Sequence, residues 1–152
     1  MSTPHQPKVW FITGASRGFG LQIARDALAR GDRVVATARK PESVTAAIGA
    51  HDDLYVLPLD VNDELQATAA AQAAVDRFGR IDVLPTNAGY GLLAAVEEAS
   101  SAEVEQLFAT NVFGLLKVTR AVLPHMRRAG RGHVINISSV GGYSAYAGWG
   151  VY

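Results

Sequence analysis

Residues 9–20, VWFITGASRGFG, decide the fold of this chain. The first five form an apolar run that is too short for a helix and is followed at once by glycine, which is typical of a strand buried on both faces. Gly14, Gly18 and Gly20 then mark a turn. From Phe19 onward, apolar residues recur at helical spacing until Gly31, which is placed to end a helix. The stretch therefore predicts a strand, a glycine-rich loop and a helix in succession.

The same alternation continues along the chain. Further strands are expected at 33–38, 54–59, 83–87 and 133–138. Helices are expected at 41–48, from an N-cap at Asn62 to near Gly79, and from a capping box of Ser100 and Glu103 to about Arg128, with a bend at Pro124. Strands that alternate with helices predict an α/β domain of Rossmann type, a doubly wound parallel sheet of five strands within residues 1–152.

Composition excludes several classes of function. The chain has 152 residues, 49% of them apolar and 18% charged, which is enough for one sizeable core. Fourteen basic residues balance fourteen acidic ones, so no net charge attracts nucleic acid or an anionic membrane. Without cysteine there is no disulfide, zinc-thiolate site or thiol nucleophile, and the four histidines lie too far apart in sequence to suggest a metal site.

The beginning of the chain, Met1 to Lys8, is polar, and no apolar run approaches membrane-spanning length. We therefore expect a soluble, cytoplasmic protein whose partners are small molecules or other subunits.

The glycine loop is placed to bind a phosphate group. Glycines between a strand and a helix permit a close approach of backbone to ligand, and a pyrophosphate would lie on the N-terminus of the helix. The spacing is G-x-x-x-G-x-G rather than the dinucleotide fingerprint G-x-G-x-x-G. A tight turn that binds nothing is the alternative. A nucleoside-triphosphatase loop is excluded because no Gly-Lys-Ser/Thr follows.

Several motifs occur in the order found in the short-chain dehydrogenase/reductase family. They are TGASRGFG at 13–20, Asp60-Val61, Asn87-Ala88-Gly89, Asn111, and ISS at 137–139 followed by Tyr152. The chain resembles this family over essentially its whole length. The resemblance implies an oxidoreductase that transfers a hydride between a nicotinamide cofactor and a secondary alcohol or carbonyl compound. It also implies a strand order of 3-2-1-4-5, with the final strands of the family's sheet missing.

The resemblance also assigns cofactor contacts. It implies that Gly14, Gly18 and Gly20 line the pyrophosphate, with Ser16 and Arg17 in the same loop. Asp60 and Val61 would meet the adenine, and Asn87-Ala88-Gly89 would pack beside the adenosine and the glycine loop. For Asp60 alone, a simple turn residue is the alternative.

Charge favours NADP over NAD. A free ribose 2′-hydroxyl is usually held by an acid at the end of the second strand, whereas a 2′-phosphate needs cations. Here the strand 33–38 is followed by Arg39 and Lys40, and Asp32 lies at the wrong end. Arg39 and Arg17 could converge on the phosphate with bidentate geometry. Two solvated surface arginines are the alternative, with NAD as the alternative cofactor.

The resemblance further makes Ser139 the donor that orients the carbonyl and Tyr152 the acid/base. These residues are thirteen apart, which matches the family, whereas Ser138 would give fourteen. Tyr143 and Tyr146 fit the spacing poorly and are expected in the wall of the substrate pocket or in a surface loop.

Asn111 lies on an apolar helix face, where a buried amide must be hydrogen-bonded. The resemblance places it in the support of a proton relay. An asparagine that merely bends the helix is the alternative.

Two departures from the family pattern qualify these expectations. The family carries a lysine four residues after its tyrosine, and the sequence ends at Tyr152. A free tyrosine has a pKa of about 10, which a nearby ammonium lowers. Pro85 and Thr86 are also unusual, and proline cannot donate to a sheet ladder.

We therefore expect a domain that is incomplete at its C-terminus. The whole protein would be an NADP-dependent, homo-oligomeric reductase, and the 152 residues alone would be weak or inactive. The strand at 133–138 would then be an open edge with unpaired backbone groups. A non-catalytic nucleotide-binding or interaction module of the same fold is the alternative function. A methyltransferase-like domain would give the Ser139–Tyr152 spacing no role.

Overall fold

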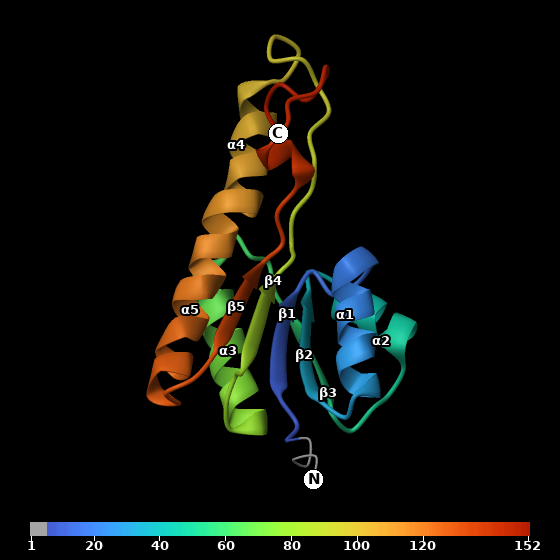
Figure 1. Ribbon diagram of the computed structural model, residues 1–152, viewed down its shortest axis with the longest axis vertical. Helices are drawn as coiled ribbons and strands as arrows, with labels where there is room; N and C mark the ends of the chain where they lie inside the picture. The colour runs from blue at the N-terminus through green and yellow to red at the C-terminus, as the bar shows by residue number, and fades with distance from the viewer. Residues whose placement is uncertain (1–5) are drawn as a thin grey trace.

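The structure, a computed structural model, describes residues 6–152 and contains a five-stranded parallel sheet with helices on both faces (Figure 1). The strands are β1 (Val9–Thr13), β2 (Arg33–Ala38), β3 (Leu54–Pro58), β4 (Val83–Thr86) and β5 (His133–Asn136). Their order is β3-β2-β1-β4-β5, and all neighbours are parallel. The predicted doubly wound fold and strand order are confirmed.

The helices divide between the two faces of the sheet. One face carries α1 (Gly18–Ala29) and α2 (Pro41–Ile48), and the other carries α3 (Glu64–Phe78) and α5 (Leu115–Arg128) (Figure 1). Side chains alternate along each central strand. Phe11 and Val35 point into the core under α3 and α5, whereas Ile12 and Val34 point into the core under α1 and α2. This alternation explains why β1 is apolar from Val9 to Ile12 and β2 from Val34 to Ala36.

The N-cap of α3 is Asp63 and not the predicted Asn62. The Asp63 carboxylate accepts hydrogen bonds from the backbone N–H groups of Gln66 at 3.0 Å and Leu65 at 2.9 Å. The Gln66 N–H, more than the Leu65 N–H, holds the pKa of Asp63 below its ordinary value. Both residues are good caps, and the ionised carboxylate occupies the position that faces the helix dipole. The other end is as predicted, because Gly79 closes α3 in the left-handed conformation with φ of 83°.

The long helical segment is interrupted at a different place from the one predicted. The predicted capping box of Ser100 and Glu103 opens α4 (Ser101–Phe108), and α5 continues through Pro124 without a break. Between α4 and α5 lies a π-helical turn, η1 (Ala109–Gly114). Such turns insert one residue into an α-helix and are frequent at functional sites. The helix is therefore not broken at Pro124, and its irregular turn lies earlier, at η1.

The helical stretch Ser101–Arg128 contains an 18-residue window with a mean hydropathy of 1.2, so by length and composition alone it could cross a membrane. The helix of a soluble protein passes the same test. Here Leu107, Val118, Val122 and Met126 are buried, and the last three of these pack in the core against α3 and the sheet. Core packing accounts for these four residues, whereas only 22% of the apolar window is buried.

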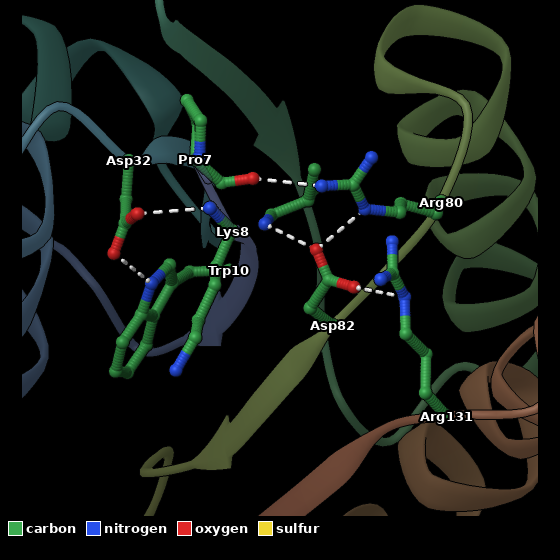
Figure 2. A network of polar contacts seen from close by, with 8 residues as sticks. Pro7, Lys8, Trp10, Asp32, Arg80, Asp82 and Arg131 are labelled. Carbon is green, nitrogen blue, oxygen red and sulfur yellow. Dashed lines mark hydrogen bonds and ion pairs between the residues drawn. The ribbon is translucent and has the colours of Figure 1, made fainter. Parts of the chain in front are cut away.

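At the amino ends of the strands, Asp32 fastens the beginning of β1. This buried carboxylate accepts from the backbone N–H of Lys8 at 2.8 Å and from the indole Nε1 of Trp10 at 2.9 Å (Figure 2). Both oxygens of the Asp32 carboxylate thus accept hydrogen bonds at the amino ends of the strands, opposite the glycine loop.

Asp82, which directly precedes β4, connects the strands at the same end of the sheet. Its carboxylate accepts from the backbone N–H of Val9 at 2.9 Å and from Arg80 Nε at 2.7 Å, and it pairs with Arg131 Nε at 3.2 Å (Figure 2). Arg80 also donates to the carbonyl oxygen of Pro7 at 2.7 Å. These bonds join the amino ends of β1, β4 and the segment leading into β5.

β5 forms the edge of the described sheet, as predicted. Ile135 is 37% exposed, and a hollow of about 500 Å³ lies beside it, lined also by Trp10, Val83 and His133. This face of β4 and β5 is left open by α1 and α2 (Figure 1).

Candidate active site

The glycine loop packs directly against the residues that follow β4. Gly14 and Gly18 adopt left-handed backbone angles, with φ of 66° and 57°. A Cβ atom on Gly14 would lie 3.0 Å from Ala88 Cα. A Cβ on Gly20 would overlap the carbonyl oxygen of Gly14 and lie 2.5 Å from Asn87 Nδ2. Only glycine fits at position 20, because the first turn of α1 rests on the loop itself.

Thr13 and Asn87 tie β1 to β4 at this point. The buried Thr13 Oγ1 accepts from the backbone N–H groups of Asn87 at 2.9 Å and Ala88 at 3.1 Å. In return, Asn87 Nδ2 donates to the carbonyl oxygens of Thr13 and Gly14, both at 3.1 Å. These side-chain bonds continue the connection between the strands beyond the pair Trp10 and Val83.

Pro85 does not disrupt β4. It stays in register opposite Ile135 of β5, and its carbonyl oxygen faces Thr13 Oγ1 at 3.5 Å. Thr86 Oγ1 donates to Asn136 Oδ1 at 2.8 Å, which adds a second link between β4 and β5. The missing proline N–H is thus tolerated because side chains bridge both neighbouring strands.

The order of the sheet reverses between β1 and β4, since the chain passes from β1 to β2 on one side and places β4 on the other. Ligands of open α/β sheets bind at such a switch point, outside the carboxyl ends of the strands. The N-terminus of α1 begins here. Arg17, its N-cap residue, makes no side-chain cap bond, and the first turn contains no acid. The positive end of this helix is therefore suited to an anion such as pyrophosphate.

Ser16, Arg17 and Arg39 lie around the same edge. Arg17 and Arg39 are exposed, and Arg39 directly follows β2, the neighbour of β1. The backbone N–H of Ala15 donates to the carbonyl oxygen of Thr37 at 3.0 Å, which holds the glycine loop against the end of β2. The residues directly after β2 are basic, and the nearest acid before them is Asp32 at the opposite edge.

Asp60 and Val61 follow β3 at this same edge. The Asp60 carboxylate accepts from the backbone N–H of Asn62 at 3.0 Å, which closes a tight turn. Val61 is buried against η1, where a Cβ on Gly114 would come within 2.7 Å of Val61 Cγ2.

Ser139 and Tyr152 both lie next to Gly141. A Cβ on Gly141 would lie 3.1 Å from the Tyr152 ring carbon Cδ1 and 3.5 Å from Ser139 Oγ. Ser139 Oγ accepts from the backbone N–H of Gly141 at 3.1 Å. Ser138, by contrast, is exposed, and its Oγ lies near Gly142. The serine that matches the family spacing is thus the one beside the tyrosine.

The Tyr152 ring is also held from other sides. It makes an edge contact with Trp149 at 5.2 Å between ring centroids, and a Cβ on Gly91 would lie 3.9 Å from the Tyr152 ring carbon Cε2. Trp149 pairs with Ala94 in an isolated bridge and lies tilted against Tyr146 at 5.9 Å between ring centroids. The segments after β4 and β5 therefore run side by side above the sheet (Figure 1). Tyr143 is 96% exposed and takes no part in this cluster.

Asn111 lies in η1 and binds the backbone of Tyr90 twice. Its Oδ1 accepts from the Tyr90 N–H at 3.1 Å, and its Nδ2 donates to the Tyr90 carbonyl oxygen at 2.7 Å. The oxygen and the nitrogen of the Asn111 side chain thus both have hydrogen-bond partners. The asparagine lies within the π-helical turn itself.

Thr13, Gly91, Gly141 and Trp149 were missed by the sequence analysis. For Thr13 a signal existed, because a hydroxyl ends an otherwise apolar strand just before the first glycine.

Comparison with known proteins now identifies the family. The model of the short chain dehydrogenase family matches residues 8–152. The chain belongs to the short-chain dehydrogenase/reductase family.

Relatives and solved structures agree with this assignment. "Oxidoreductase BOA17" of Botryotinia fuckeliana is 44% identical over 147 residues, covering 95% of this chain and 54% of that protein. "NADP-dependent 3-hydroxy acid dehydrogenase YdfG" of Shigella flexneri is 38% identical over 145 residues, covering 93% and 58%. A short-chain dehydrogenase from Streptomyces avermitilis has a TM-score of 0.91 at 44% identity, covering 97% of this chain and 55% of that one. The chain thus spans about half the length of these relatives.

Proposed function

We propose that this short-chain dehydrogenase/reductase transfers a hydride between NADP(H) and a secondary alcohol or ketone. One observation carries the proposal: the Thr13–Asn87 contact and the Ser139–Gly141–Tyr152 cluster lie beyond the carboxyl ends of neighbouring strands. The residues fit a dinucleotide, because the close packing of Gly14 and Gly20 places the N-terminus of α1 at the carboxyl ends of β1 and β4. The bound cofactor would supply the hydride.

The hydroxyl groups of Tyr152 and Ser139 take different roles in this proposal. The Tyr152 hydroxyl gives its proton to the substrate oxygen during reduction and receives it back during oxidation. The Gly141 N–H already occupies one lone pair of Ser139 Oγ, so the serine hydrogen is directed elsewhere and can donate to the same oxygen. Tyr146 and Trp149 flank the tyrosine and would form part of the substrate wall.

Asn111 supports this arrangement by holding the segment after β4 through Tyr90. Gly91 of that segment lies next to the Tyr152 ring, which a Cβ at this position would meet at 3.9 Å, so the amide would act on the tyrosine through the backbone.

Basic residues support NADP as the cofactor. Arg17 and Arg39 would meet the 2′-phosphate, since guanidinium groups bind phosphate oxygens in pairs. The relative YdfG is named as NADP-dependent, and ElxO with NADP bound has a TM-score of 0.88 at 30% identity, covering 95% of this chain and 60% of that one.

We further propose a cytoplasmic homo-oligomer that uses the exposed face of the long helix. Phe108, Val112, Phe113 and Leu116 are each at least 41% exposed and recur at helical spacing. A contiguous apolar face of this kind marks an interaction surface.

Removing a phosphate contact should change cofactor preference. In Arg39→Ala, the affinity for NADPH should fall about tenfold, the factor expected for one charged hydrogen bond, while that for NADH stays the same. Arg30→Ala, at the far end of α1, is the matched control. Calorimetric dissociation constants check this. Equal affinity of the unsubstituted protein for both cofactors, or unchanged NADPH binding in Arg39→Ala, refutes the assignment.

Removing the proposed proton carrier should stop turnover without affecting cofactor binding. In a protein that contains this segment, Tyr152→Phe should lower kcat for a small ketone by about 10²–10⁴-fold. Tyr143→Phe, which removes an exposed hydroxyl, should leave kcat unchanged. If the unsubstituted protein binds NADPH but reduces no ketone or aldehyde, the non-catalytic alternative is correct. An active Tyr152→Phe enzyme would show that another group carries the proton.

A charge on the exposed helix face should dissociate the oligomer. Leu116→Glu places a carboxylate in the proposed interface, so sedimentation velocity should show a smaller species. Leu65→Glu changes an apolar residue of α3 that is 83% exposed and should leave the mass unchanged. A monomeric unsubstituted protein, or an unchanged mass for Leu116→Glu, would count against this interface.

A further inference from the structure

The turn after β3 has a shape fixed by its own hydrogen bonds. Asp60 accepts from the Asn62 N–H at 3.0 Å and donates its own N–H to Gln66 Oε1 at 2.9 Å. Gln66 Nε2 in turn donates to Asp63 Oδ2 at 3.0 Å. These bonds join residues 60–66 to one another, so they set the shape of the turn but not its position relative to the rest of the cleft.

The position of the turn is set by three residues of the long helix. Gly114 packs against Val61, and Thr110 Oγ1 accepts from Asn62 Nδ2 at 3.2 Å. One turn further on, Lys117 Nζ donates to the carbonyl oxygen of Asn62 at 2.6 Å. Lys117 is the charged member of this set.

Lys117 brings a positive charge to the turn after β3. Its half-buried ammonium lies near the N-terminus of α3, where the helix dipole disfavours positive charge. The pKa of Asp63 is lowered first by the Gln66 N–H, and the charge of Lys117 makes the smallest contribution to the same lowering. The direct contact of the ammonium with this turn is the hydrogen bond to the Asn62 carbonyl oxygen.

Asn62 depends on these helix contacts. Its side-chain oxygen Oδ1 is buried and has no hydrogen-bond partner among residues 6–152. Apart from the turn itself, Asn62 is fastened by Nδ2 to Thr110 and by its carbonyl oxygen to Lys117. Without the lysine, one polar contact between this turn and the long helix is lost.

We propose that Lys117 is a positioning residue for the adenosine half of the cofactor, acting through the turn Asp60–Asp63. This inference rests on the proposed NADP(H) function, in which Asp60 and Val61 meet the adenine. The lysine touches neither cofactor nor substrate. Its loss lets the turn move away from the cleft while the nicotinamide end, held by Asn111 and Gly141, stays in place.

The test substitutes Lys117 by methionine, which keeps the length of the side chain and removes the charged donor. Arg120→Met is the matched control, because it removes a cation from an exposed position on the same helix. Lys117→Met should weaken NADPH and adenosine 2′,5′-bisphosphate to a similar extent, about tenfold, the factor expected for one charged hydrogen bond. The kcat at saturating NADPH should not change, because the catalytic groups are untouched.

A second measurement does not depend on cofactor. Hydrogen exchange of the Val61 and Asn62 amides in the cofactor-free protein should be faster in Lys117→Met and unchanged in Arg120→Met. If Lys117→Met does not fold, Thr110→Val removes the neighbouring contact to Asn62 and should produce the same adenosine-selective loss.

The outcomes separate this inference from the proposed function. If the unsubstituted protein binds NADPH and Lys117→Met binds it equally well, the positioning role is refuted and the NADP(H) function stands. A loss of kcat equal to the loss of affinity also refutes it, since the effect would then be general. If the unsubstituted protein binds neither NADPH nor adenosine 2′,5′-bisphosphate, the proposed function itself fails.

Discussion

The candidate site depends on the hydrogen bonds exchanged by Thr13 and Asn87 across the ends of β1 and β4. One hydroxyl accepts two backbone N–H groups, and one amide donates to two backbone carbonyls. Because Pro85 contributes no N–H to the ladder, these side chains hold the strands together where the crevice begins. The glycine loop then packs on Asn87 so closely that a Cβ at position 20 has no room. The packing of the glycine loop, the pairing of the strands and the start of α1 therefore depend on the same residues.

Charged side chains have different surroundings at the amino ends and at the carboxyl ends of the strands. At the amino edge, Asp32 and Asp82 are bound by backbone N–H groups and neighbouring side chains, so these charges hold the strands together. At the carboxyl edge, the helix N-terminus, Arg17 and Arg39 face outward, and polar groups of the long helix hold the surrounding segments. Asn111 holds the segment after β4, and Lys117 holds the turn after β3. The π-helical turn and the residues just after it thus position loops at both ends of the cleft.

Much of this fold follows from sequence periodicity. The predicted bounds of β1, β2 and α2 agree with the structure, because each run is bounded by glycine, proline or charged residues, although the helical pattern of α2 is weak. The N-cap of α3 was displaced by one residue, since Asn62 and Asp63 are both good caps and only the tertiary contact of Asn62 with Thr110 decides between them. The helix distortion could not be placed from sequence, because Pro124 is the local signal, whereas the π-helical turn lies where Gly114 and Asn111 contact Val61 and Tyr90, which are distant in sequence. The residues of the site were predicted from family motifs. The glycine that separates Ser139 from Tyr152 became evident only in three dimensions.

The most direct test of this account compares Gly20→Ala with Gly18→Ala. Both replace a glycine of the same loop, but a Cβ at position 20 meets Asn87 and the Gly14 carbonyl, whereas a Cβ at position 18 has nothing within 4 Å. We expect Gly20→Ala to lower the free energy of unfolding by about 1–3 kcal/mol, as for overpacking, and to abolish measurable NADPH binding. Gly18→Ala carries only the strain of a left-handed backbone and should keep a folded loop that binds NADPH more weakly. A Gly20→Ala protein that binds NADPH as tightly as the unsubstituted one would contradict the claim that the contact of Gly20 with Asn87 forms the site.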